Sequence, residues 1–284
     1  MYSRRDLAKI ALGAFSAGRL LARPNSTIRG VTIGVQSRSF RDRPLEEAVA
    51  AMVEVGIGSC ELWEGHVAPP RMSRKGLREW RETIAIEQFQ LVAGTFSKAG
   101  VKIHAYNYDI DEDFSERETQ RGFEMAKALG ASLVTASPPA AMVKGLNALA
   151  AKAGMFVGLR NREGAQAGAL VSSDDLVAAM RGNANIGVAL DLGDFATSGY
   201  DAVRFITGHL DRTFSVYLRD RQKDHGDSVP FGQGNTPLAA VLKLIQGKRA
   251  SIAAMIDYDY QGADPVAEVG RSLGFCRQTL MAKF

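Results

Sequence analysis

The residues of this 284-residue chain that could do chemistry stand at the ends of short apolar runs. Asp191, Asp257 and Arg160 each come directly after such a run. Carboxylates transfer protons or bind divalent cations. A guanidinium binds carboxylates or an oxyanion, but it has no lone pair and cannot act as a base. The three side chains therefore predict a compact polar site, if the chain brings these ends together.

Further polar and aromatic residues occupy similar places and complete the candidate site. We expect a catalytic set of Asp257, Asp191, Arg160 and His104, with Asp191 and Asp257 as the ligands of any weak metal site. For substrate binding we expect Glu61, Trp63, His66, Arg162, Tyr217 and Arg219. The competing interpretations are solvated loop charges, a structural salt bridge between Arg160 and the two aspartates, hydrogen-bonded structural histidines and, for Trp63, core packing.

The elements that must position these residues alternate along the chain. Short β-branched or apolar runs predict strands at Val31–Ser37, Ser59–Trp63, Val101–Tyr106, Leu133–Ala136, Phe156–Leu159, Gly187–Leu190, Thr213–Leu218 and Ile252–Ile256. Amphipathic stretches between them predict helices, for example at Leu45–Val55, Arg117–Leu129, Ser173–Met180, Leu238–Gln246 and Pro265–Met281. Helix ends are expected at Gly56, Gly100, Gly130 and Gly154.

Eight strand–helix units in about 250 residues predict a single (β/α)8 TIM barrel with a parallel eight-stranded core. An open dinucleotide-binding sheet fits less well, because Gly34-Val35-Gln36-Ser37 after the first strand lacks the glycine-rich fingerprint. Chemistry in such barrels lies at the C-terminal ends of the strands. We therefore expect Asp191, Asp257 and Arg160 to meet within hydrogen-bonding reach at that end, and His66 and His104 to lie near it.

Composition and charge exclude several classes of protein. Hydrophobic residues make up 46% and charged residues 23% of the chain, as in an ordinary folded protein. The net charge of +4 lies entirely in residues 1–23, and the remainder is neutral. We therefore expect no nucleic-acid partner. No apolar run of 18 residues predicts a membrane span.

The N-terminal residues have the features of a targeting signal. Arg4-Arg5 followed by Lys9 and a short apolar stretch resembles a twin-arginine export signal. We expect a signal peptide over 1–23, a barrel domain over 28–284 and a periplasmic or otherwise exported mature protein; a disordered basic arm is the alternative. Cys60 and Cys276 have no metal-like spacing and are expected to be buried, inert thiols.

Six motifs carry a resemblance that spans about residues 30 to 281. They are Gly34-Val35-Gln36 with Ser39-Phe40-Arg41-Asp42, Cys60-Glu61-Leu62-Trp63-Glu64-Gly65-His66, Leu190-Asp191-Leu192-Gly193, Tyr217-Leu218-Arg219-Asp220, the segment 230–238, and Met255-Ile256-Asp257-Tyr258-Asp259-Tyr260. Each is weak alone, but together and in this order the chain resembles the xylose-isomerase-like sugar phosphate isomerase/epimerase superfamily.

The resemblance implies a divalent metal held by Glu, Asp, His and Glu from strands 5 to 8, which stabilises a sugar enediolate. Here strand 5 carries Arg160, strand 7 carries Tyr217 and strand 8 carries the shorter Asp257, while Asp191 is retained. We therefore expect no cofactor, with Arg160 in place of the ion and a net charge of −1 on Arg160 and the two aspartates. Mn²⁺, Mg²⁺ or Zn²⁺ is the alternative.

The resemblance further implies a small-molecule carbohydrate as the partner. We expect a sugar or keto-sugar isomerase/epimerase that works through an enediolate-type intermediate at the C-terminal mouth, over a degenerate metal site. A catalytically inactive sugar-binding barrel, a keto-sugar lyase and a structural or interaction subunit are the alternatives. Homo-oligomerisation is left open.

Overall fold

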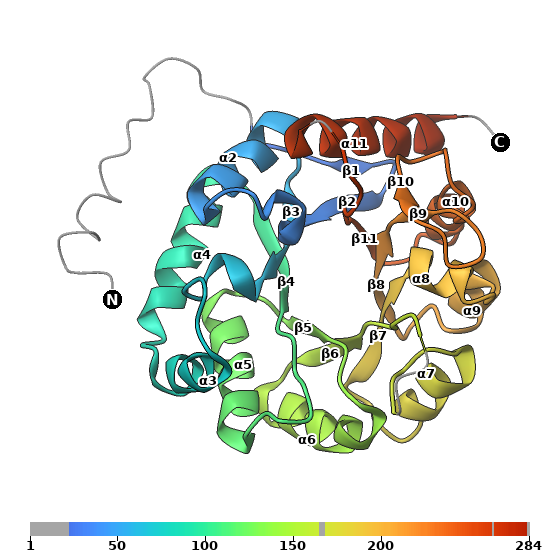
Figure 1. Cartoon of the computed structure of the whole chain (residues 1–284). Coiled ribbons are helices and arrows are strands. Elements are labelled where there is room, and N and C mark those ends of the chain that lie inside the picture. Colours follow the sequence, from blue (N-terminus) through green and yellow to red (C-terminus); the bar gives the residue numbers. More distant parts are fainter. Residues whose placement is uncertain (1–22, 165–167, 263, 283–284) are drawn as a thin grey trace, which may run out of the picture.

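Eight parallel strands close into the predicted barrel, with helices around the outside (Figure 1). The computed structural model describes residues 23–164, 168–262 and 264–282. The barrel strands are β2 (Val31–Gln36), β3 (Ser59–Trp63), β4 (Lys102–Asn107), β5 (Leu133–Ala136), β6 (Phe156–Leu159), β7 (Ile186–Asp191), β8 (Thr213–Leu218) and β11 (Ala253–Ile256). Each pairs in parallel with the next, and β11 returns to β2, so Ala254 faces Ile33 and closes the ring.

Helices connect successive strands and pack on the outer face of the barrel. They are α2 (Leu45–Val55), α3 (Arg74–Thr83), α4 (Glu87–Ala99), α5 (Glu116–Ala128), α6 (Val143–Ala153), α7 (Ser173–Met180), α8 (Leu192–Thr197), α9 (Ala202–Gly208), α10 (Leu238–Lys248) and α11 (Pro265–Met281). Short 3-10 turns follow β2 (Ser37–Phe40), β3 (Glu64–His66) and β5 (Ala140–Met142). Strand β1 (Thr27–Ile28) pairs antiparallel with β2, and β9 (Asp220–Arg221) pairs with β10 (Ser228–Val229).

The predicted elements agree with the structure to within two residues at each end, because hydrophobic period and local punctuation set them. The four glycines expected to end helices all have positive φ: Gly56, Gly100, Gly130 and Gly154. The β9–β10 hairpin had no counterpart in the predicted pattern. Within the described ranges, no helix combines the length and hydropathy that a bilayer crossing requires.

The main hydrophobic core lies between the strands and the helices. Outward-facing strand residues such as Ile33, Cys60 and Leu62 are fully buried there. Cys60 and Cys276 are buried free thiols, as expected, and burial raises the pKa of both. A separate apolar cluster of Ala189, Tyr217, Ala253 and Met255 comes from the alternate strand positions, which face the barrel interior.

Met255 fills the middle of the barrel interior. A Cβ placed on Gly34 would lie only 2.4 Å from its Sδ, so a larger residue at this position requires the Met255 side chain to move. Along the same face of β11, Ala253 stands toward the N-terminal end of the barrel. Asp257 follows the strand at the other end. The barrel therefore has polar residues toward both ends and an apolar layer between them.

Candidate functional site

The Arg160 guanidinium bridges two buried aspartates at the C-terminal end of the barrel. Its Nη2 donates to Asp191 Oδ2 at 2.6 Å and to Asp257 Oδ2 at 2.7 Å. Arg160 directly follows β6, Asp191 ends β7 and Asp257 directly follows β11. Parallel strands of a closed barrel bring these ends together, so the predicted convergence is confirmed.

A second guanidinium completes the cluster. Arg219 Nη2 donates to Asp257 Oδ2 at 2.9 Å and lies 3.4 Å from Asp191 Oδ2. Arg160 and the two aspartates sum to the expected net charge of −1, and the Arg219 guanidinium, which the expectation did not include in the cluster, brings the four groups to neutrality. The sequence carried a signal for this pairing, because Tyr217 and Arg219 are two residues apart and alternation places them on the same side.

Asp257 is ionised and weakly basic in this cluster. Burial would raise the pKa of its carboxyl, but the Arg219 and Arg160 guanidiniums outweigh burial and hold that pKa well below its usual range. A carboxylate held by two arginines takes up a proton reluctantly. Its Oδ2 accepts hydrogen bonds from both guanidiniums and so holds them in place.

Asp194 has the opposite electrostatic character. It lies in the first turn of α8, where its Oδ1 accepts from Arg219 Nη1 at 3.1 Å and Arg221 Nη1 at 2.8 Å. Burial and the neighbouring Asp191 raise the pKa of Asp194 to about 6. Its Oδ2 accepts no hydrogen bond from the described residues, and 14% of the side chain is exposed. Asp194 can therefore exchange a proton near neutral pH.

Beneath the arginines lies a buried pair that crosses the barrel interior. The Tyr217 hydroxyl donates to Glu61 Oε1 at 2.6 Å, and Gln36 Nε2 donates to the same oxygen at 2.9 Å. Burial is the main cause that raises the pKa of Glu61 to about 7. Both Glu61 and Tyr217 are fully buried, so a ligand at the mouth does not reach them in this conformation.

These residues do not fit the divalent metal that the resemblance implies. A hard cation needs several oxygen or imidazole ligands around an open centre. Arg160 instead places its Nη2 against both acidic ligands, and Tyr217 stands where the resemblance implies histidine. The described part of the chain holds no group of three or more histidine, cysteine or acidic residues arranged for a metal.

The other predicted binding residues lie at or after the C-terminal ends of β3 and β6. Trp63 is half-buried at the end of β3, edge-on to His66 with ring centroids 5.5 Å apart. Both ring nitrogens of His66 are occupied, by Ser37 Oγ at 2.9 Å and the Phe40 carbonyl at 3.2 Å. His66 thus has no free nitrogen for a ligand. Arg162 is 42% exposed, and its Nη2 lies 3.3 Å from Asp109 Oδ1.

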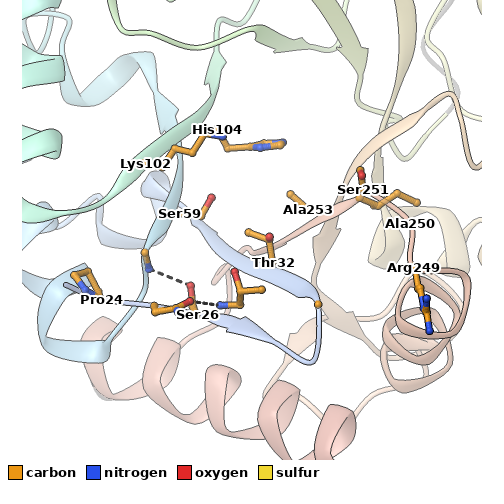
Figure 2. Close-up of a pocket in the computed structure, with 15 residues that line it drawn as sticks. Pro24, Ser26, Thr32, Ser59, Lys102, His104, Arg249, Ala250, Ser251 and Ala253 are labelled. Atoms are coloured by element: carbon orange, nitrogen blue, oxygen red, sulfur yellow. Dashed lines mark hydrogen bonds between the residues drawn. The ribbon is translucent and has the colours of Figure 1, made fainter. Parts of the chain in front are cut away.

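The expectation that His104 lies at the C-terminal mouth is wrong. It is the third residue of β4 and stands three residues, roughly 10 Å, before the strand's C-terminal end. Its side chain lines a cavity at the N-terminal end of the barrel together with Thr32 and Ser59 (Figure 2). His104 is therefore removed from the candidate catalytic set.

The fold and the position of this cluster define the class of protein. A closed eight-stranded parallel barrel with interlocking acidic and basic residues at the C-terminal strand ends is a TIM barrel with its site in the usual place. Residues 49–279 match the family described as Xylose isomerase-like TIM barrel, and the chain belongs to that family.

Solved structures with the same fold include sugar epimerases. The 3-keto-D-glucoside 4-epimerase of E. coli is 14% identical over 87% of this chain and 99% of its own, with a TM-score of 0.67. An L-ribulose 3-epimerase is 14% identical over 88% and 95%, with a TM-score of 0.65. The probable 3-DHS dehydratase AsbF of Bacillus anthracis is 12% identical over 86% and 98%, with a TM-score of 0.66. No curated protein matches the sequence significantly.

Proposed function

We propose that this protein is a sugar or keto-sugar isomerase/epimerase in which arginine replaces the divalent metal. One observation carries the proposal. Arg160 Nη2 is fixed by Asp191 and Asp257, whereas its Nε and Nη1 make no hydrogen bond with the described residues and its side chain is 16% exposed. A fixed cation with unused donors resembles, in electrostatic terms, a bound metal with an open position.

The reaction needs no oxidant or reductant. A base removes a proton from the carbon beside the substrate carbonyl, and the electron pair of that C–H bond moves to the carbonyl oxygen. The enediolate that forms carries its negative charge on oxygen, where the Arg160 donors stabilise it. Donation of a proton by a water molecule to the other face of the same carbon, with the base returning the abstracted proton to the solvent, gives the epimer. Return of the abstracted proton to the neighbouring carbon, with proton transfer between the oxygens, gives the isomer.

We assign proton removal to Asp194. Its pKa of about 6 leaves it mostly ionised at neutral pH, yet basic enough to accept a proton. Its Oδ1 is held by Arg219 and Arg221, which fixes the carboxylate in place while Oδ2 remains available. Asp191 and Asp257 then act as positioning residues, because they hold the guanidiniums without facing the substrate.

The proposed substrate class rests on the relatives and on the surface around the cluster. The structural neighbours named above include epimerases of a keto-glucoside and of ribulose. Trp63, half-buried at the C-terminal end of β3, offers an aromatic ring against which a sugar ring can stack. Arg38 and Asp259, paired at 3.4 Å and 40% and 30% exposed, offer polar contacts for hydroxyl groups.

Two alternatives have specific support. The ion pairs that engage both Asp191 and Asp257 favour a barrel that binds sugars without acting on them. The neighbour described as a probable dehydratase favours a keto-sugar lyase, in which the same enolate expels a leaving group from the adjacent carbon. Both alternatives place the ligand at the same mouth.

Hydrogen exchange at the substrate carbon separates these functions. We would incubate the protein with a panel of sugars and keto-sugars in D₂O and follow the products by NMR. Deuterium at the carbon beside the carbonyl, together with an epimer or isomer, is the expected result. An unsaturated product without an epimer would establish the lyase, and saturable binding without exchange would establish the silent barrel.

Variants then test the assigned roles. Asp194→Asn should lower the exchange rate at least about a hundredfold, the usual contribution of a general base. Arg160→Lys should lower kcat more than it raises KM, because the donors act on the enediolate. Arg204→Lys, an equivalent change on the exposed face of α9, is the matched control. Full activity in Asp194→Asn would refute the assignment of the base.

A further inference from the structure

A cavity of about 370 Å³ opens at the N-terminal end of the barrel, opposite the proposed active site. Residues near the starts of β1, β2, β3, β4 and β11, the residues just before β1 and the turn after α10 surround it. Figure 2 shows His104 reaching from its strand across this space, with Thr32 and Ser59 below it and Ser251 and Ala253 on the far side. The volume falls within the range of small-molecule sites.

The cavity contains hydrogen-bonding groups that the protein does not use. His104 Nε2 is buried without a partner. Among the described residues, the hydroxyls of Thr32, Ser59 and Ser251 line the cavity and make no hydrogen bond, which leaves them open to a ligand. A buried polar atom without a partner, as His104 Nε2 is among the described residues, is rare in folded proteins and calls for an explanation such as a bound molecule.

The charges at the cavity have one sign. Lys102 and Arg249 line it, and none of its lining residues is acidic. Helix α10 ends next to the cavity, and the full charges of the two side chains exceed the partial negative charge of a helix C-terminus. A cation would find neither a carboxylate nor a favourable potential.

His104 is suited to donate or accept a hydrogen bond as a neutral group. Burial, and then the nearby Lys102 ammonium, lower the pKa of its ring to about 4. At neutral pH the ring therefore carries one N–H and one free lone pair. The Nε2 atom can donate to an oxyanion while the hydroxyls around it turn to do the same.

The apolar layer of the barrel separates this cavity from the active-site mouth. Ala253 lines the cavity and Asp257 belongs to the mouth, and Met255 occupies the interior between them against Gly34. A molecule in the cavity would not contact Arg160 or Asp194. The two ends of the barrel can therefore hold different ligands at the same time.

We propose that the N-terminal end of the barrel is a second binding site, for a small molecule that carries a carboxylate or phosphate group. Lys102 and Arg249 attract the oxyanion, and His104 with the hydroxyls of Thr32, Ser59 and Ser251 binds it. Because the proposal rests on this cavity alone, it stands or falls independently of the reaction at the mouth.

Histidine NMR of the full chain tests the proposal, because the sequence has only four histidines. The ring signals of labelled protein would be followed during titration with inorganic phosphate, citrate or uncharged glycerol at constant ionic strength. The His104 signal is assigned by its loss in His104→Gln. We expect phosphate or citrate to shift it saturably and glycerol to leave it unchanged.

Two surface variants provide the decisive comparison. Lys102→Gln should weaken anion binding about tenfold, because it removes one hydrogen bond from a charged donor. Lys98→Gln removes the same charge from the exposed surface of α4 and should leave the affinity unchanged. The proposal fails if neither anion shifts His104 saturably, if both variants bind alike, or if glycerol binds and the anions do not.

Discussion

The Arg160 guanidinium lies over the ring of Tyr217, with its central carbon 4.1 Å from the ring centroid. Such a cation–π contact is strongest where water is excluded, as beneath this cluster. Tyr217 therefore holds Arg160 from below while Asp191 and Asp257 hold it from the sides. The tyrosine hydroxyl continues to Glu61, so one residue joins the buried interior to the arginine cluster at the mouth.

Loss of Arg160 should destabilise the protein strongly. Arg160→Met leaves Asp191 and Asp257, which are 0% and 2% exposed, with Arg219 as their shared cation. Breaking a buried ion pair from one side costs about 3 kcal/mol of unfolding free energy. Urea denaturation measures this loss of unfolding free energy. The double variant Arg160→Met/Asp257→Asn should recover part of it, because one of the two uncompensated carboxylates is removed. Arg117→Met, which removes an exposed ion pair, should cost less than about 1 kcal/mol. If Arg160→Met lost no more unfolding free energy than Arg117→Met, the expectation would be contradicted.

The buried Glu61 should make stability fall as the pH rises. Its pKa is raised from 4.5 to about 7 in the folded state, so the folded protein binds more protons than the unfolded chain between these values. The penalty begins near pH 4.5 and is complete above pH 7, at about 3 kcal/mol as an upper figure. Glu61→Gln cannot ionise, so it should gain stability relative to the wild type between pH 5 and 8.

Denaturation of both proteins at several pH values measures this difference. Glu46→Gln loses a carboxylate on the exposed surface of α2 and serves as the control for charge alone. A constant difference between wild type and Glu61→Gln across this range would show that Glu61 titrates normally.

We expect weak binding of divalent metal by the wild type. A +1 guanidinium and a +2 ion about 4 Å apart repel by about 8 kcal/mol at an effective dielectric of 20, an upper figure before relaxation. Calorimetric titration with Mn²⁺, Mg²⁺ and Zn²⁺ measures the affinity. Arg160→Glu/Tyr217→His should gain affinity, although Arg219 remains 3.4 Å from Asp191. Tight binding by the wild type would restore the metal-dependent mechanism.

Export is predicted from a segment that lies outside the described residues. Arg4 and Arg5 with Lys9 before an apolar stretch resemble a twin-arginine signal. Replacing both arginines by lysine should leave the precursor in the cytoplasm, because that pathway recognises the arginine pair. Cell fractionation with immunoblotting of the tagged chain measures it. Export of the double variant at the normal level would remove the basis for a periplasmic location.

The sequence alone determined the strands, many of the helices and the residues at the strand ends. Those features depend on neighbours within a few positions: apolar period fixes the element type, and glycine fixes where helices stop. The meeting of Arg160, Asp191 and Asp257 followed from barrel closure, which brings the C-terminal ends of all strands to one rim.

Only the tertiary structure decided how those charges pair. Arg219 joins both aspartates, and Tyr217 reaches Glu61 across 156 positions of the chain. Such contacts depend on the length and rotamer of each side chain in the folded structure, and the neighbouring sequence does not predict them. His104 shows the same limit, because a strand's period gives the face of a residue, whereas its height in the barrel depends on where the strand begins. That start is set by packing and by pairing with β3, whose register shifts between Cys60 and Glu61.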